Sequence, residues 1–168
     1  MSTRVIENLR RVEIFAGLSD DELLQVAALC TAVRAPAGKT IFKEGDEGDE
    51  MYIIHEGSVR VMINTRTPDG HVAPSTINVL YSGQCFGEMV LLNSGSRSAT
   101  IAAVDPTTLI VIHEPDFRAL CEANPRIGYC VIRNLAQDLA YKLRSSNLLL
   151  RGNIRWQHRE LEPREKAR

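Results

Sequence analysis

The chain has 168 residues, of which 44% are hydrophobic and 24% are charged, and its formal net charge is −1. This composition is typical of a globular domain, and the small net charge excludes a strong overall field toward nucleic acid or an anionic membrane. The first residues have no signal-peptide core, and no apolar run approaches the ~20 residues of a membrane span, so we expect a cytoplasmic protein.

Two helices are predicted before residue 36. Residues 3–14 carry apolar side chains at near-helical spacing. Ser19 is followed three residues later by Glu22, which is the pattern of a capping box at a helix start. The second helix is expected to continue through about Thr31, so we assign residues 1–35 to an N-terminal helical segment.

After Pro36 the pattern changes to short apolar runs that are separated by Gly, Pro, Asp and Asn. Many short strands with frequent turns are typical of a sandwich or barrel. Residues 36–115 are therefore expected to form one β unit. The predicted strands cover residues 40–43, 51–55, 58–66, 75–81, 98–104 and 107–113.

Residues 116–155 are predicted to be helical. A short helix ends at Pro125, because proline disfavours a helical residue before it. A longer helix runs from about Arg126 to Asn153 or beyond. Residues 156–168 form a charged tail, which we expect to be disordered.

The later part of the long helix carries small and apolar residues at 3–4 spacing, and a polar residue in such a seam fixes its register. We expect residues 143–161 to form a homodimer with a second copy, although Gly152 weakens this stretch. The alternative is that the stripe packs on its own β unit, and this applies to its first half. The seam residues are Ala136, Ala140, Leu143, Asn147, Leu150 and Ile154.

Residues 86–100 are the most informative segment. They combine a Gly–Glu pair, a short apolar turn, a Ser/Gly-rich loop and a single arginine. Gly87 lets the backbone approach a ligand closely, and N–H groups in such a turn can bind an anion. The guanidinium of Arg97 suits phosphate oxygens, and the Glu88 carboxylate can accept a hydrogen bond from a sugar hydroxyl.

This segment resembles the phosphate-binding cassette of cyclic nucleotide-binding domains, the family of the bacterial catabolite activator protein, protein kinase A regulatory subunits and cyclic-nucleotide-gated channels. The resemblance covers roughly residues 8–147, and the glycines of residues 38–57 also match. It implies an eight-stranded jelly roll (a β-roll) with N-terminal helices and a long C-terminal helix. The matching cassette positions are Phe86, Gly87, Glu88, Leu91, Arg97, Ser98 and Ala99.

The same resemblance implies a role for each site residue. Arg97 would pair with the cyclic phosphate, Glu88 would accept the ribose 2′-hydroxyl, and Ser98 would donate to the phosphate. In the family, Thr at the position of Ser98 is associated with guanine and Ala with adenine, so serine leaves the base open. Gly87 and the backbone N–H groups of Met89 and Val90 can meet the phosphate at the start of the cassette helix. Ala99 follows Ser98 as a further ligand-site residue, and Lys142, Ser146 and Asn147 fall near positions that meet the purine.

The expected function is a regulatory module without catalysis or a cofactor, which binds cAMP or cGMP. Its C-terminal helix would transmit binding to an unidentified protein partner. Only about fifteen residues follow this helix, so we expect no DNA-binding domain and a small complete protein, unless the chain is a fragment.

Two alternatives remain. Ser96 and Val90 depart from the family pattern, so the chain could be a degenerate dimeric scaffold with an empty roll or a cyclic dinucleotide ligand. A cupin-like metalloenzyme is opposed by the histidines, which lack a clustered ligand motif, and they are expected to be satisfied or exposed: His55, His71, His113 and His158. The four cysteines form no CxxC pair and are expected to be buried or incidental thiols.

Overall fold

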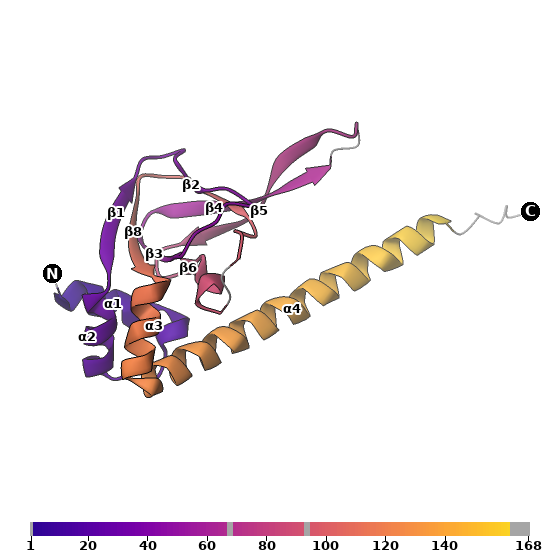
Figure 1. Cartoon of the computed structure of the whole chain (residues 1–168). Helices are drawn as coiled ribbons and strands as arrows, with labels where there is room; N and C mark the ends of the chain where they lie inside the picture. Colours follow the sequence, from indigo (N-terminus) through magenta and orange to yellow (C-terminus); the bar gives the residue numbers. More distant parts are fainter. Residues whose placement is uncertain (1, 67–68, 93–94, 162–168) are drawn as a thin grey trace, which may run out of the picture. The chain divides into compact units, whose positions relative to one another are not determined.

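In a computed structural model, helices precede and follow two four-stranded antiparallel sheets (Figure 1). The structure describes the backbone of residues 2–66, 69–92 and 95–161, and the side chains of residues 5–66, 69–92 and 95–144. The chain divides into two units, residues 1–134 and 135–168, and each is described by itself.

The N-terminal helices start where the sequence predicts. The Ser19 backbone N–H donates to the Glu22 carboxylate at 2.8 Å, and the Glu22 N–H donates to the Ser19 hydroxyl at 3.4 Å, so the predicted capping box is confirmed. It satisfies donors that a helix start otherwise leaves unpaired. The elements are α1 (Ser2–Arg11), the 3-10 turn η1 (Glu13–Phe15) and α2 (Asp20–Ala28).

The predicted end of the second helix is wrong. Helix α2 ends at Ala28, and the next element is the strand β1 (Thr31–Ala35), so the last five residues of the expected helical segment are extended. Strand β1 pairs antiparallel with β8 (Thr107–His113), yet four of its five residues are exposed. Backbone pairing rather than side-chain burial defines this strand, so its sequence shows no apolar alternation.

Within the described part of the chain, eight strands form the sheets, in the orders β1-β8-β3-β6 and β2-β7-β4-β5, which confirms the expected jelly roll. The pattern of residues alone predicts six of them. It misses β1 and the two-residue strand β6 (Cys85–Phe86), which is too short to show a period. The others are β2 (Thr40–Phe42), β3 (Glu50–Glu56), β4 (Ser58–Arg66), β5 (Val72–Tyr81) and β7 (Thr100–Ala103).

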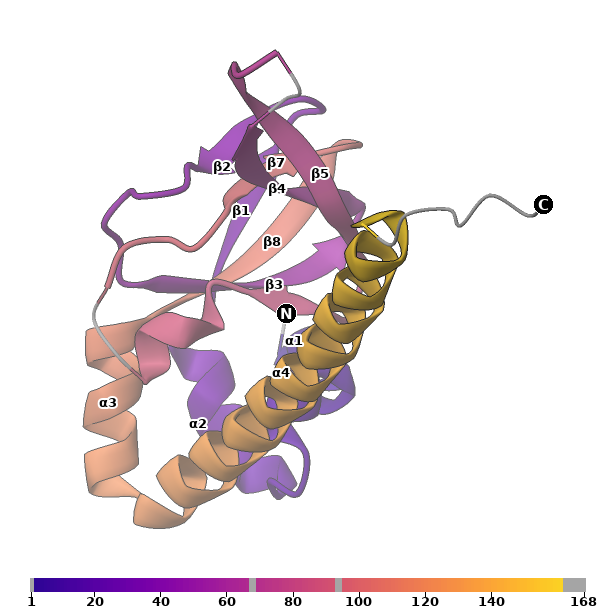
Figure 2. The ribbon, with the colours of Figure 1, turned by 90° about the vertical axis from the view of Figure 1, so that its right-hand side faces the viewer.

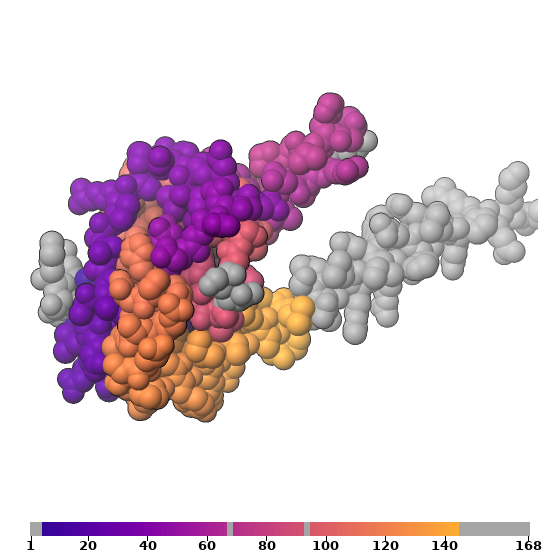
Figure 3. All heavy atoms as spheres, viewed as in Figure 1, coloured from indigo at the N-terminus to yellow at the C-terminus, as the bar shows by residue number. Residues whose placement is uncertain are grey.

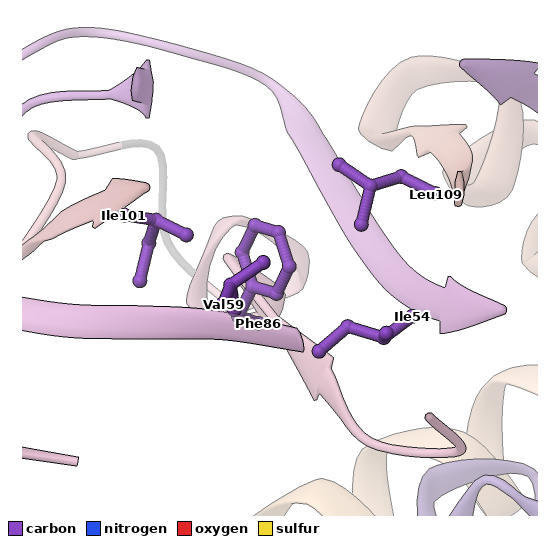
Figure 4. Close-up of a cluster of buried hydrophobic side chains, with 5 residues drawn as sticks. All are labelled: Ile54, Val59, Phe86, Ile101 and Leu109. Atoms are coloured by element: carbon purple, nitrogen blue, oxygen red, sulfur yellow. The ribbon is translucent and has the colours of Figure 1, made fainter. Parts of the chain in front are cut away.

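The core lies between the two sheets. Five buried side chains from five strands point toward one another (Figure 4): Ile54, Val59, Phe86, Ile101 and Leu109. Strand β8 is buried at four consecutive positions, 109–112, which means that both of its faces are covered. Phe86 belongs to this core and also begins the cassette segment, so the core positions the site directly.

The cassette contains a short 3-10 helix, η2 (Glu88–Leu91), which lies against β3 and α3 (Glu114–Ala123) (Figure 2). Strands β4 and β5 form a hairpin that projects from the roll, as the magenta surface shows (Figure 3). The cassette and the hairpin are therefore separate features of the roll.

Helix α4 (Pro125–Leu161) follows α3 immediately and continues beyond Trp156, so the first residues of the expected disordered tail are helical. Its last described side chain is that of Arg144. The seam residues Asn147, Leu150 and Ile154 lie outside the described side chains, so the homodimer stays a prediction.

None of the four cysteines, which all lie among the described residues, forms a disulfide, and all are partly buried: Cys30, Cys85, Cys121 and Cys130. Burial raises the pKa of the Cys30 thiol to about 12, which makes this residue a poor nucleophile.

None of the helices within the described residues is long and apolar enough to cross a membrane.

Candidate functional site

Arg97 is fixed by two backbone hydrogen bonds to the loop between β2 and β3. Its N–H donates to the Asp46 carbonyl at 2.8 Å, and the Gly45 N–H donates to the Arg97 carbonyl at 2.8 Å. The residue as a whole is only 5% exposed. Arg97 is therefore not a surface arginine of a polar loop, and its charge needs partners inside the roll.

Glu50 supplies two of these partners. One terminal nitrogen of Arg97 donates to the Glu50 carbonyl at 2.8 Å, and the other donates to the Glu50 carboxylate at 3.0 Å. The Nε–H of Arg97 is buried and has no hydrogen-bond partner among the described residues. A buried donor without an acceptor costs about 1–3 kcal/mol, so the Nε–H of Arg97 still needs a hydrogen-bond acceptor.

Aromatic rings lie beneath the guanidinium. The Arg97 Cζ lies 4.2 Å from the centre of the Phe42 ring, within the range of a cation–π contact. Phe42 in turn packs against Tyr52 and Phe86, whose rings are stacked at 5.0 Å. Burial, together with the Glu50 carboxylate, raises the pKa of Tyr52. This apolar floor strengthens any charge interaction made above it.

Two glycines allow the guanidinium to lie where it does. A Cβ on Gly48 would be 2.5 Å from one terminal nitrogen of Arg97, and a Cβ on Gly87 would be 2.8 Å from the other. Gly87 also has a φ of +71°, which residues with a side chain rarely adopt. We define the Arg97 site as Phe42, Gly48, Glu50, Gly87 and Arg97.

The cassette residues after Gly87 form the turn η2. Glu88, its first residue, is 8% exposed, and Val90 is also buried. The Val90 N–H donates to the Gly87 carbonyl at 3.4 Å within the turn, and its contact with a phosphate stays a prediction. Met89 is half-exposed.

The two residues after Arg97 differ in exposure. Ser98 is exposed, and its hydroxyl contacts the Met89 sulfur at 4.0 Å, so it joins the two ends of the cassette. Ala99 is partly buried. Ser98 follows Arg97 directly in the chain and Ala99 comes one residue later, and their contact with a phosphate stays a prediction.

The residues predicted to meet the base lie in the second unit. Lys142 forms an ion pair with Asp138 one turn earlier in α4, with 2.7 Å between nitrogen and oxygen. The side chains of Ser146 and Asn147 are outside the described residues. The contact of these three residues with a base therefore stays a prediction.

Comparison with known proteins decides the family. The family model of the cyclic nucleotide-binding domain matches residues 32–124, more than half of the chain. The chain belongs to the cyclic nucleotide-binding domain family. The match includes the strands of the roll, the cassette and the whole Arg97 site.

Two curated relatives are longer than the chain itself. Over 137 residues it is 36% identical to the cyclic AMP receptor protein of Thermus thermophilus, covering 82% of this chain and 60% of that protein. It is 35% identical to Glutaminase 1 of Bradyrhizobium diazoefficiens over 80% of this chain and 20% of that enzyme.

A solved structure supports the same family. The regulatory domain of Toxoplasma gondii PKA in complex with cAMP superposes with a TM-score of 0.63 and 26% identity, covering 70% of this chain and 43% of that chain. The chain thus spans between one fifth and three fifths of the length of these relatives. What the longer proteins do as a whole is not carried over with the domain.

Several partners of Arg97 lie outside the segment that the sequence singles out. Phe42, Gly48 and Glu50 all precede the cassette by more than 30 residues. Gly48 gave a usable signal, since a glycine in the Asp46–Asp49 turn can mark a close approach as well as a turn. Glu50 gave none, because a charged residue at a strand start is ordinary.

Proposed function

We propose that this domain binds a cyclic mononucleotide, cAMP or cGMP, and acts as a regulatory module without catalysis of its own. The observation that carries the proposal is the buried guanidinium of Arg97, whose Nε–H lacks an acceptor among the described residues. A cyclic phosphate supplies an anionic acceptor, and a charge-assisted hydrogen bond contributes about 1.5–3 kcal/mol.

Glu50 has a defined part in this proposal. It holds both terminal nitrogens of Arg97 and so fixes the plane of the guanidinium, while the Nε–H is left for the ligand. The phosphate must compete with the Glu50 carboxylate for the same positive charge. Glu50 therefore orients Arg97 and also limits its affinity for anions.

The other cassette residues take roles around the sugar and the phosphate. Glu88 accepts the ribose 2′-hydroxyl, and the Gly87 and Met89 backbone and the Ser98 hydroxyl contact the phosphate. Lys142, Ser146 and Asn147 meet the base when helix α4 covers it. The names of two relatives refer to cyclic AMP, which favours cAMP over cGMP.

Helix α4 is the proposed output. A ligand shifts a helix only if it binds one position of that helix more tightly than another. We propose that the nucleotide selects one position of α4, that α4 joins two copies into a homodimer, and that a partner protein detects the change. We also propose a cytoplasmic location.

Calorimetric titration of the chain with cAMP, cGMP and cyclic di-GMP tests the ligand. We expect one of the two mononucleotides to bind, and Arg97→Ala to weaken it at least roughly tenfold, which is about 1.4 kcal/mol. Arg126→Ala is the matched control and should bind like the unchanged chain. Equal affinity in Arg97→Ala would remove this site from the proposal.

The dimer has a separate test. Sedimentation should show that the chain truncated after residue 142 is monomeric. A truncated chain that remains dimeric would place the interface elsewhere.

One observation favours a second candidate, a dimeric scaffold that holds no ligand or holds a cyclic dinucleotide. The Glu50 carboxylate already neutralises Arg97 at 3.0 Å, so the guanidinium is partly satisfied without any ligand. The same titration separates the candidates, because a scaffold binds neither mononucleotide.

A further inference from the structure

Three potential metal ligands gather at one edge of the sheet that contains β3 and β8. Glu50 begins β3 and Asp49 directly precedes it, and His113 ends β8 directly opposite Glu50 in the strand register. One ligand atom from each of the three lies within 4.8 Å of the others. The sequence could not show this cluster, because more than 60 residues separate His113 from the two acids.

The backbone holds the cluster in place. The Glu50–His113 pairing belongs to an antiparallel ladder that continues through Met51 and Ile112, both fully buried. The Glu114 N–H donates to the Asp49 carbonyl at 2.7 Å, which joins the loop before β3 to the start of α3. The three side chains thus project from anchored backbone positions.

We propose that Asp49, Glu50 and His113 bind a divalent transition-metal ion of the zinc class. An imidazole nitrogen with two carboxylate oxygens is a donor set that such ions accept, and three protein ligands leave a further position for water. The His113 Nδ1 lies 3.7 Å from an Asp49 carboxylate oxygen. Two ligands that each bind zinc at about 2.0–2.2 Å lie roughly 3.3–3.6 Å apart in a tetrahedron, so a small side-chain adjustment closes the site.

Charge and access also suit a cation. The two carboxylates carry two negative charges, and the Arg97 guanidinium offsets one of them through Glu50. A carboxylate can accept from a guanidinium and still coordinate a metal, because its two oxygens offer about four lone-pair sites. Arg97 therefore acts as an outer partner that orients Glu50. The side chains of Asp49 and His113 are 56% and 44% exposed, so an ion can enter from solvent.

The test is a titration of the full chain with Zn²⁺, using a chromophoric chelator as competitor. We expect one ion per chain, and His113→Gln should weaken its binding at least roughly tenfold. His71→Gln is the matched control, because His71 is an exposed histidine in the loop between β4 and β5 and is not one of the three proposed ligands. This variant should bind Zn²⁺ like the unchanged chain. Because His113 is part of β8, Asp49→Asn provides a second variant with the same expected loss.

The absorption spectrum of bound Co²⁺ distinguishes binding at this site from binding by cysteine thiolates. Co²⁺ bound by nitrogen and oxygen gives no sulfur-to-metal charge-transfer band, whereas thiolate ligation does. The proposal is overturned if no ion binds, if His113→Gln and Asp49→Asn bind like the control, or if the cobalt spectrum shows thiolate ligands.

Discussion

Two arginine–glutamate pairs of this domain have the same chemistry, but one arginine is buried and the other is exposed. Arg97 pairs with Glu50 in the roll with its side chain 4% exposed, and its Nε–H has no acceptor among the described residues. Arg126 pairs with Glu22 between α4 and α2 with its side chain 58% exposed, and it also donates to the Gly17 carbonyl at 3.2 Å.

The difference indicates what each pair is for. Burying an ion pair removes two charges from water, and an unmatched donor adds to that penalty. Such a site is reasonable where a ligand completes it. Arg126 keeps more than half of its side chain in contact with solvent, and its partner Glu22 belongs to the capping box of α2, so this pair fastens two helices together. Sequence alone does not separate the pairs, because both are a glutamate and a distant arginine.

The largest expected effect comes from exchanging each arginine for lysine. Arg97→Lys should weaken cyclic nucleotide binding at least roughly tenfold, because an ammonium cannot reproduce the planar fork that Glu50 orients. Arg126→Lys should leave the affinity unchanged. Calorimetry on both variants checks this, and equal losses in the two would end the distinction between the pairs.

Neutralising each glutamate should have a smaller effect of opposite sign. Glu50→Gln removes the anion that competes for Arg97, so nucleotide affinity should rise, by roughly fivefold if the pair contributes about 1 kcal/mol. Glu22→Gln should not change it. If Glu50→Gln weakens binding instead, Glu50 serves chiefly to orient Arg97.

The helix junction should respond in stability rather than in binding. Ser19→Ala removes the hydroxyl that accepts from Glu22 and should lower the free energy of unfolding by about 1 kcal/mol. Denaturant unfolding measures the loss, with nucleotide titration as the control that should not change. An unaltered midpoint would mean that Arg126 alone supports the junction.

The smallest expected effect is on how the stability of the fold depends on pH. The hydrogen bond from Arg126, followed by that from the Ser19 N–H, lowers the pKa of Glu22 below its ordinary value of 4.5. The stability from this carboxylate is therefore fully present above that ordinary value and is lost as the pH falls through the lower folded-state value. Thermal unfolding from about pH 6 to about pH 3 should show a steeper decline in the unchanged chain than in Glu22→Gln. Parallel curves would mean that Glu22 has the same pKa in the folded and unfolded states.

The sequence by itself determined the parts that depend on neighbouring residues. The capping box at Ser19, the change from helical to strand pattern after Pro36 and the cassette around Gly87 and Arg97 are local signals, and the fold that they imply is confirmed. These features can be predicted from the sequence because helix caps and tight turns use residues within a few positions of each other.

Only the tertiary structure decided the rest. Strand β1 exists because β8 pairs with it, and the guanidinium of Arg97 meets Phe42, Gly48 and Glu50 because two sheets bring separate loops together. Such contacts depend on strand register and on burial, and neither can be predicted from the residue types of one segment. The sequence therefore identified Arg97 as a site residue. The fold decided that Arg97 is buried, that Glu50 pairs with it, and that its Nε–H has no hydrogen-bond partner among the described residues.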